Sequence, residues 1–361
     1  MINKLNSSQP LKVLMMPDYR IDNPYQRLLA NATQNYNVTV FFPVGYRRVF
    51  PVWRAIKDQP ESIDVVHIHW LESFIKGQSL ITRLLYSVKF LLDILLTRLS
   101  GVKVVWTIHD YLEHDAPHPE LELWLRKVLV HLSNKLIIHN QSFLETIASE
   151  YGFPEKKAVV IPHGHYRNVY GSSIDKSIAR QKLNLPTDKL VYLYLGMIRP
   201  YKGIEDLLDV WEKHKFDNSL LLIAGNPIIP EYGKFIKDKI DTLNDVLLYD
   251  FFIKNEDIHL FFSAADIVVL PFKKVLTSGS AILAMSFGKP IIAPKMGSLP
   301  DLLSDAKTLL YDSQDKTGLA TALLNSHHLN LEELSKIIIK ACDDLDWDKI
   351  GYKTSEVYHN C

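Results

Sequence analysis

Short aliphatic runs that alternate with longer helical patterns constrain the fold of this chain more than any other feature. They occur at residues 11–15, 38–42, 65–68, 102–108, 135–139 and 158–161, and again at 190–195, 219–224, 246–248, 267–270, 290–293 and 308–311. Strands that alternate with helices form parallel sheets with crossover helices. With 361 residues, 47% of them hydrophobic, the chain is long enough for two cores. The pattern therefore predicts an α/β fold with two parallel sheets in succession.

A polar stretch at 166–189 separates the two predicted sheets and has no strand-like apolar run. We expect an N-terminal domain over 1–168, a C-terminal domain over 169–345 and a terminal helical segment over 346–361. We interpret 166–189 as the linker between the first two of these parts.

Charge and cysteine content narrow the classes of function. Lys plus Arg and Asp plus Glu both total 41, so no net field favours nucleic acid. Cys342 and Cys361 are far from any paired spacing, which argues against a disulfide framework and suits a reducing compartment. The start of the chain does not resemble a signal peptide, and no uncharged apolar run reaches the roughly 18 residues of a spanning helix. We expect a cytoplasmic protein that does not bind nucleic acid.

The segment 79–99 has a broad aliphatic face when its residues are placed at helical steps. The face comprises Ile81, Leu84, Leu85, Val88, Leu91, Leu92, Leu95, Leu96 and Leu99. One interpretation is a crossover helix packed on the first sheet. The other is a helix that touches the inner face of a membrane, as basic amphipathic helices do.

Histidines lie at, or directly after, the ends of four strands predicted in the first half. They are His67, His69, His109, His139 and His163. Since ligands bind beyond the carboxyl ends of parallel strands, these imidazoles are expected to meet at one edge and to face a ligand. The spacings His67-x-His69, His114-x3-His118 and His163-x-His165 also suggest zinc. Zinc sites usually add acidic or thiolate ligands in tighter motifs, so we expect no metal.

Two further groups in the first half carry polar chemistry. Asp110 directly follows His109, and such a pair can orient an imidazole, hold a sugar hydroxyl or provide a base. The loop 22–25 is positioned to close over a ligand through the amide of Asn23 and the ring of Tyr25. No glycine-rich dinucleotide motif or Walker lysine follows the first strand, which disfavours nicotinamide and ATP chemistry.

Cations and glycines follow the first strand of the second half. The segment 196–203 begins with Gly196, ends with Gly203, and carries Arg199 and Lys202 between them. A planar guanidinium together with a compact ammonium suits a diphosphate.

A second anion-binding site is predicted at the start of the helix that follows residue 270. Thr277, Ser278, Gly279 and Ser280 stand at its start. Small residues there expose main-chain N–H groups, and hydroxyls add donors. Simple capping of the helix uses the same geometry, so both interpretations stay open.

Together these stretches resemble the GT-B glycosyltransferases of family four over nearly the whole chain. The matching motifs are 64–69, 107–110, 161–164, 195–203, 224–227, 265–271 and 288–293. The resemblance implies two Rossmann-like domains facing across a cleft, with the C-terminal helix crossing back to the N-terminal domain. It also implies a metal-independent reaction that needs no cofactor beyond the nucleotide-diphosphate sugar.

The resemblance also implies roles for particular residues. Arg199 and Lys202 would hold the donor diphosphate. The donor site would also include Gly196, Asn226, residues 277–280 and main chain near Ile253, which meets the nucleobase. His109 would line the reacting sugar. From their places in the sequence, we assign Asn23, Tyr25, His69, His139 and His163 to the acceptor side of the cleft.

Three positions depart from the family pattern. The two glutamates of the family would fall at Val275 and Leu283, the glycine pair after the first strand is replaced by 22–25, and the expected asparagine is His163. A retaining reaction would proceed by front-side attack with His109 steadying the sugar. An inverting one needs a carboxylate base, for which Asp110 comes first, with Glu113 and Asp115 behind it.

We therefore predict transfer of a hexosyl unit from a UDP- or GDP-sugar to a hydroxyl of a glycan or lipid-linked saccharide, with retention favoured over inversion. Two alternatives remain. One is a sugar-nucleotide epimerase or phosphorylase on the same fold. The other is a non-catalytic sugar-nucleotide-binding protein, which the missing glutamates favour.

Overall fold

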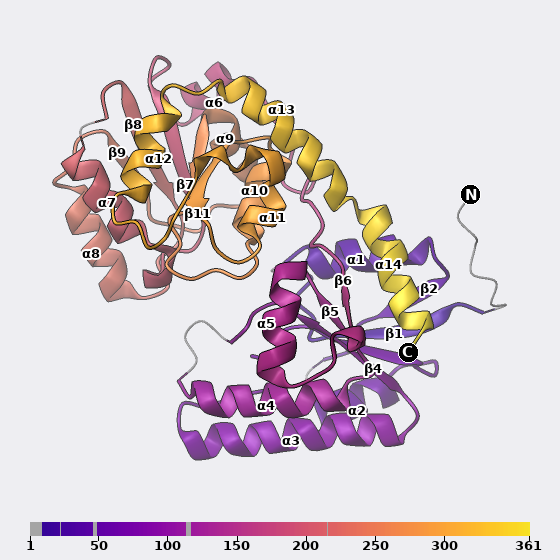
Figure 1. The fold of residues 1–361 in the computed structure, drawn as a ribbon. Helices are drawn as coiled ribbons and strands as arrows, with labels where there is room; N and C mark the ends of the chain where they lie inside the picture. The colour runs from indigo at the N-terminus through magenta and orange to yellow at the C-terminus, as the bar shows by residue number, and fades with distance from the viewer. Residues whose placement is uncertain (1–8, 22, 46–48, 113–116, 215) are drawn as a thin grey trace. The chain divides into compact units, whose positions relative to one another are not determined.

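The computed structural model describes all residues except 1–8, 22, 46–48, 113–116 and 215, and the side chain at 304 is also left undescribed. The chain divides into two compact units. Met1–Gly164 and Leu345–Cys361 form the first unit, and His165–Asp344 form the second. Each unit is an α/β body (Figure 1).

The first unit is built on a six-stranded parallel sheet in the order β2-β1-β3-β4-β5-β6. Its strands are β1 (Leu11–Met16), β2 (Val38–Phe41), β3 (Val65–Ile68), β4 (Lys103–Ile108), β5 (Lys135–Ile138) and β6 (Ala158–Val160). Strands β3 and β5 are almost wholly buried, as parallel strands covered on both faces must be. Strand β2 lies on one side of β1, and β3 and the later strands lie on the other side. Ligands bind in open α/β sheets at this kind of switch point in the strand order.

The helices of the first unit are α1 (Tyr25–Gln34), α2 (Pro51–Lys57), α3 (Leu80–Leu99), α4 (Pro119–Leu132), α5 (Gln141–Tyr151) and α14 (Trp347–His359), with the 3-10 turn η1 (Glu155–Lys157). Helix α14 packs on α1, where a Cβ at Gly351 would stand 2.5 Å from the Ala32 carbonyl oxygen. Its Ile350 and Val357 join the core formed with Val13 and other buried strand residues. The end of the chain thereby completes the first unit.

The second unit repeats the plan with the strand order β12-β11-β10-β7-β8-β9. Its strands are β7 (Leu190–Leu195), β8 (Ser219–Ala224), β9 (Val246–Tyr249), β10 (Ile267–Val269), β11 (Ile291–Pro294) and β12 (Leu310–Tyr311). The direction reverses between β7 and β10. The predicted α/β fold with two Rossmann-like units is confirmed, since all twelve expected strands are present.

The helices of the second unit are α6 (Lys176–Lys182), α7 (Ile204–Lys213), α8 (Pro230–Ile240), α9 (Ile258–Ala264), α10 (Gly279–Ser286), α11 (Leu299–Leu303), α12 (Gly318–Ser326) and α13 (Leu331–Cys342). Short 3-10 turns are η2 (Pro200–Lys202), η3 (Ser304–Leu309) and η4 (Asp343–Leu345), the last of which joins the two units. Apolar residues of α7, α8 and α12 form one core with the strands.

The stretch 166–189 is not the plain linker expected from its polar sequence. It contains α6, which packs on α9. Arg180 is buried there, donating to the carbonyl of Ala264 and to the Asp266 carboxylate at 2.6 Å. Most other residues of the stretch are exposed, in keeping with its polar sequence.

The interpretation of 79–99 as a crossover helix is confirmed, since α3 connects β3 to β4, but most of its aliphatic face does not pack on the first sheet. Helix α3 lies beside α2 and α4 and contacts β4. It buries Arg83, Asp93 and Thr97 together with Phe90, Leu91 and Ile94, and its other leucines are exposed. Among the residues that the structure describes, α3 included, no helix is long and apolar enough to cross a membrane.

Candidate active site

Two main-chain loops meet at the carboxyl edge of the second sheet. The Ile198 N–H donates to the Asn226 carbonyl at 3.0 Å, and the Ile228 N–H donates to the Ile198 carbonyl at 3.3 Å. A Cβ at Gly225 would stand 1.8 Å from the Gly196 carbonyl oxygen, so the loops after β7 and β8 approach closely because residue 225 is glycine. The contact holds the start of 196–203 against the sheet.

The start of helix α10 lies beside the same loop. A Cβ at Gly196 would lie 3.6 Å from the Ser280 hydroxyl oxygen. The Ser278 hydroxyl accepts from the Ala281 N–H at 3.1 Å, so Ser278 caps the helix. The first N–H groups of a helix have no acceptor within it and attract anions. Four residues were predicted to form an anion-binding site. Ser278 caps the N-terminus of α10, and Thr277, Gly279 and Ser280 are partly exposed.

Arg199 precedes the turn η2 and Lys202 ends it, and both side chains are half-buried. The Lys202 ammonium lies 4.6 Å from the centre of the Phe272 ring and 5.2 Å from that of Tyr201. The Lys273 N–H donates to the Tyr201 carbonyl at 2.9 Å, which ties the loop after β10 to the loop after β7. Both cations therefore lie at the switch point between β7 and β10.

Two other predicted donor residues lie at the same edge but farther along the sheet. Asn226 is exposed, and its carbonyl serves the loop contact. Ile253 is buried after the edge strand β9, next to the exposed rings of Phe251 and Phe252. The structure brings Asn226 to the cationic loop through the bond to Ile198, whereas Ile253 follows β9 at the edge of the sheet.

Imidazoles converge at the carboxyl edge of the first sheet, as their strands predict. His69 Nδ1 lies 3.1 Å from His109 Nε2, and His109 Nδ1 lies 3.2 Å from His139 Nε2. His139 Nδ1 lies 3.0 Å from the Ile161 carbonyl oxygen. Three side chains from three neighbouring strands thus form one hydrogen-bonded row.

The bond from His139 to the Ile161 carbonyl determines which imidazole nitrogen donates and which accepts along the row. A carbonyl oxygen only accepts, so His139 donates from Nδ1 to Ile161. Neutral His139 then accepts at Nε2 from His109 Nδ1, and His109 accepts at Nε2 from His69 Nδ1. His69 Nε2 is left as a buried acceptor that has no hydrogen-bond partner among the described residues. Both ring nitrogens of His109 are engaged within the protein.

Burial keeps the histidines of this region neutral. Desolvation lowers the pKa of His67 to about 3, of His139 to about 4 and of His163 to about 3. It also places the pKa values of His69 and His109 well below the usual range. Neighbouring imidazoles add to the lowering, because a second positive charge would be close. At neutral pH these side chains act as hydrogen-bonding groups rather than charges.

Tyr25 packs over the imidazoles. Its ring centre lies 5.7 Å from His69, 5.3 Å from His109 and 4.6 Å from His163. The Asn23 side-chain oxygen accepts from the Tyr25 N–H at 3.0 Å, so Asn23 orders the turn before α1. Because Tyr25 is nearly fully buried, its ring belongs to the wall of the cluster.

Asp110 is half-buried, and its carbonyl accepts from Arg126 Nη1 at 2.7 Å. Arg126 in turn bonds the Glu122 carboxylate at 2.6 Å. The two reserve bases of the inverting mechanism, Glu113 and Asp115, lie outside the described residues, as does His114 of the zinc spacing. Within the residues that the structure describes, no group of three or more His, Cys, Asp and Glu side chains is arranged to hold a metal ion.

Sequence reasoning missed Trp70 and Tyr358. Trp70 stacks on His109 with ring centres 4.3 Å apart, and an aromatic residue directly after His69 was the available signal. The Tyr358 hydroxyl lies 2.7 Å from His67 Nδ1, while His67 Nε2 lies 2.7 Å from the Thr107 hydroxyl. Since 291 residues separate His67 from Tyr358, no local pattern could have paired them.

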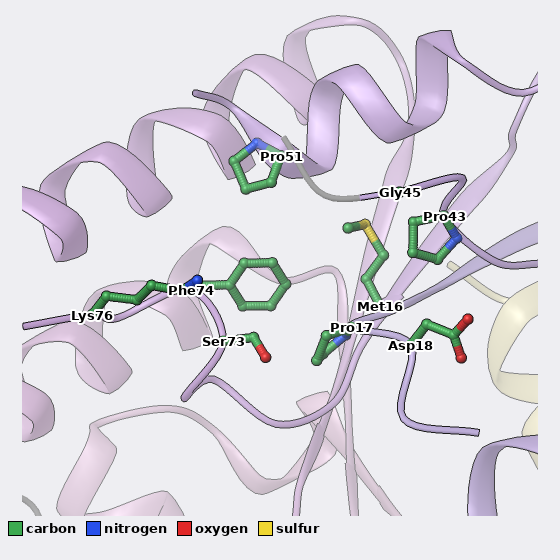
Figure 2. A pocket seen from close by; sticks show the side chains of 9 residues that line it. All are labelled: Met16, Pro17, Asp18, Pro43, Gly45, Pro51, Ser73, Phe74 and Lys76. Atoms are coloured by element: carbon green, nitrogen blue, oxygen red, sulfur yellow. The ribbon is translucent and has the colours of Figure 1, made fainter. Parts of the chain in front are cut away.

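A cavity of about 290 Å³ opens at the switch point of the first sheet (Figure 2). It is lined after β1 by Pro17 and Asp18 and after β3 by Ser73, Phe74 and Lys76. The Tyr19 hydroxyl lies 2.5 Å from the Ser73 hydroxyl and joins the two loops. The cavity offers both signs of charge beside an aromatic ring.

Family models match both units of the chain. The model described as Glycosyltransferase Family 4 matches residues 16–165, and the model described as Glycosyl transferases group 1 matches residues 175–342.

Two curated relatives align with most of the chain. A GDP-mannose:glycolipid 4-beta-D-mannosyltransferase of Xanthomonas campestris pv. campestris is 27% identical over 301 residues, covering 82% of this chain and 80% of the relative. The lipopolysaccharide 1,2-N-acetylglucosaminetransferase of Salmonella typhimurium is 24% identical over 351 residues, which cover 93% of this chain and 86% of the relative.

Solved structures share the fold at low identity. A sucrose-phosphate synthase from Thermosynechococcus elongatus gives a TM-score of 0.72 at 16% identity, over 98% of this chain and 99% of that one. Anabaena Alr3699/HepE, solved in complex with UDP and glucose, gives a TM-score of 0.71 at 17% identity, over 97% of this chain and 100% of that one.

Proposed function

The chain belongs to the group 1 glycosyltransferases, glycosyltransferase family 4, and we propose that it moves a hexosyl unit from a UDP- or GDP-sugar to a hydroxyl of a glycan or lipid-linked saccharide. The second unit binds the donor, and the first unit binds the acceptor. GDP-mannose is the first donor to test, because it is named for a relative that aligns with 82% of this chain.

One observation carries the donor assignment. The loop with Arg199 and Lys202 lies against the start of α10, where a Cβ at Gly196 would be 3.6 Å from the Ser280 hydroxyl. Two cations and a helix N-terminus at one switch point provide what a diphosphate needs. These groups neutralise the departing nucleoside diphosphate directly, so the proposed reaction requires neither a metal nor a cofactor.

The acceptor assignment rests on the cavity between the loops after β1 and β3. A saccharide hydroxyl can bond Asp18 or Ser73 there, and a sugar ring can pack on Phe74. The Lys76 ammonium suits the phosphate of a lipid-linked acceptor. Relatives named for glycolipid and lipopolysaccharide acceptors support this class.

We favour retention of configuration by front-side attack. The clustered imidazoles are neutral, and the donor phosphate takes the acceptor proton as the bond to the departing diphosphate breaks. His109 contacts the sugar by giving up its hydrogen bond to His69 or His139. Inversion is the second candidate, with Asp110 as base. It is favoured by the name of a relative that forms a β-mannosyl linkage, since an α-linked donor reaches a β product by inversion. Proton NMR of the anomeric signal of the product separates the two.

A cytoplasmic location at the inner face of the membrane fits this acceptor class. Neither Cys342 nor Cys361 forms a disulfide, as suits a reducing compartment. Cell fractionation tests the location, and recovery of the native protein outside the cytoplasm would contradict it.

Calorimetry with a panel of nucleotide sugars, followed by turnover assays with and without acceptor, tests the function. We expect one UDP- or GDP-sugar to bind, with rapid turnover only when acceptor is present. Donor turnover without acceptor would favour an epimerase or a phosphorylase. Tight binding with no turnover would favour a non-catalytic sugar-nucleotide-binding protein.

A further inference from the structure

Helix α3 presents its apolar face to solvent along its whole length. The exposed residues of the helix are all aliphatic: Leu80, Ile81, Leu84, Leu85, Val88, Leu92, Leu95, Leu96 and Leu99. Ile81, Leu85 and Leu99 expose about 72%, 66% and 75% of their surface. Single exposed leucines are ordinary, but a continuous apolar patch of this extent marks a binding surface. We call these nine side chains the α3 face.

The polar side of α3 is anchored inside the unit, which explains why the leucines point outward. The Asp93 carboxylate accepts from the Val52 and Trp53 N–H groups at 2.8 and 2.9 Å and thereby caps α2. Arg83 lies 3.8 Å from the Glu122 carboxylate of α4. Rotating the helix to bury the leucines would expose these partners or leave them unpaired.

The charged side chains of α3 that reach solvent have one sign. Lys89 and Arg98 are partly exposed at its borders, and Lys76 is exposed shortly before the helix begins. Asp93, the acidic residue of α3, is buried. The described part of α3 spans the complete helix, so its solvent-facing surface is aliphatic with basic borders and carries no carboxylate.

The α3 face is linked to the acceptor cavity through the fold. Phe74, which lines the cavity, stacks on Phe90 of the buried side of α3 with ring centres 4.7 Å apart. Lys76, on the same wall, lies three residues before Ser79, which caps α3. Cavity and helix therefore belong to the same unit and share a direct aromatic contact.

We propose that the α3 face lies in the interface of a lipid bilayer that contains anionic headgroups, with its leucines among the acyl chains and its cations at the headgroups. A helix of 20 residues lying flat extends about 30 Å along such a surface. This inference deepens the proposed function, because a lipid-linked saccharide would be presented to the cavity from the bilayer that α3 touches.

A second copy of the chain is the competing occupant of this face. Ile81, Leu85, Val88, Leu92, Leu95 and Leu99 recur at alternating steps of four and three residues, as in a helix-pairing seam. Pairing two copies through the face would bring basic borders together, with no exposed carboxylate of α3 to meet them. Charge complementarity favours the anionic lipid surface.

Co-sedimentation with lipid vesicles tests the proposal on the full chain. We expect strong binding to vesicles of phosphatidylcholine with phosphatidylglycerol, weak binding to phosphatidylcholine alone, and weaker binding as salt rises. The double variant Leu85→Glu, Leu92→Glu should bind at least tenfold less. Leu324→Glu, at an aliphatic residue of α12 that is 44% exposed, is the matched control and should bind like the wild type.

Two further measurements keep the result interpretable. Circular dichroism melting shows whether the double variant folds, and Lys89→Gln, a milder change, should weaken binding only to the anionic vesicles. Calorimetry with the donor should give the same affinity for the double variant as for the wild type, so a failure of donor binding would count against the proposed function and not against the membrane surface.

The proposal is overturned if the wild type does not bind vesicles that contain phosphatidylglycerol. It is also overturned if the wild type is a dimer by sedimentation, the double variant is a monomer, and both bind vesicles equally. The second outcome would assign the α3 face to a second copy.

Discussion

Gly203 and Pro271 are in main-chain contact: a Cβ at residue 203 would lie 1.8 Å from the Pro271 carbonyl oxygen, and Gly203 has a φ of 74°. Gly203 directly follows Lys202, and Pro271 directly precedes Phe272, over whose ring the Lys202 ammonium lies. This contact brings the loops after β7 and β10 together.

Exchange of Gly203 for Ala should therefore disturb the donor site and the fold at once. A side chain at this φ costs about 1–2 kcal/mol, and the clash adds about 1–3 kcal/mol. Urea unfolding should show both penalties, and calorimetry should show weaker donor binding. Gly101→Ala is the control, because Gly101 has a φ of 88° with no neighbour within 4 Å and should show the backbone penalty alone.

Tyr358→Phe should destabilise the protein by about 1–3 kcal/mol, since it leaves buried His67 Nδ1 without the hydroxyl that lies 2.7 Å away. Urea unfolding measures the loss. Tyr352→Phe, on the same helix, removes a half-buried bond to Glu356 and should change stability by less than about 0.5 kcal/mol. Equal effects of the two changes would mean that α14 does not hold β3 through this bond.

Acid should destabilise the first unit over a defined window. Burial lowers the pKa values of His67 and His163 to about 3 and of His139 to about 4, whereas unfolded histidine titrates near 6.5. Below pH about 6.5 the unfolded chain binds more protons, so stability falls as pH drops from about 6.5 towards 4. Each such histidine contributes about 1.4 kcal/mol per pH unit in that window.

His163→Asn tests whether the buried histidines cause the acid sensitivity, because it removes one buried imidazole. Its free energy of unfolding should fall less steeply between pH 6.5 and pH 5 than that of the wild type. Parallel slopes would show that His163 does not contribute to the acid sensitivity.

Chelation should leave turnover unchanged. If Arg199, Lys202 and the start of α10 meet the charge of the leaving diphosphate, a metal ion has no necessary role. Initial rates with excess EDTA should match those with added magnesium to within about twofold. A loss of activity that magnesium restores would contradict this part of the account.

The sequence predicted the twelve strands and the meeting of the histidines for physical reasons. Parallel strands buried on both faces read as aliphatic runs, and side chains that follow them must gather at one edge. It did not predict the orientation of α3. Periodicity shows which residues share a face, but not that Asp93 would cap α2 or that Arg83 would meet Glu122.

Contacts between distant segments were equally out of reach. Neither the bond between His67 and Tyr358 nor the closeness of Gly196 to Ser280 has a local signal, since both depend on how the elements fold together. The residue types at the donor edge were visible in sequence, whereas their joining by main-chain contacts was not.

The most direct test of the central claim is kcat/KM for Arg199→Ala and Lys202→Ala with the donor identified by calorimetry. We expect each change to lower kcat/KM by about 10²–10³, as loss of a charge-stabilising contact in the transition state does. Lys213→Ala, at an exposed lysine in the last turn of α7, should have no effect. If Arg199→Ala and Lys202→Ala both retained activity within about threefold of the wild type, the diphosphate would not be bound by this loop.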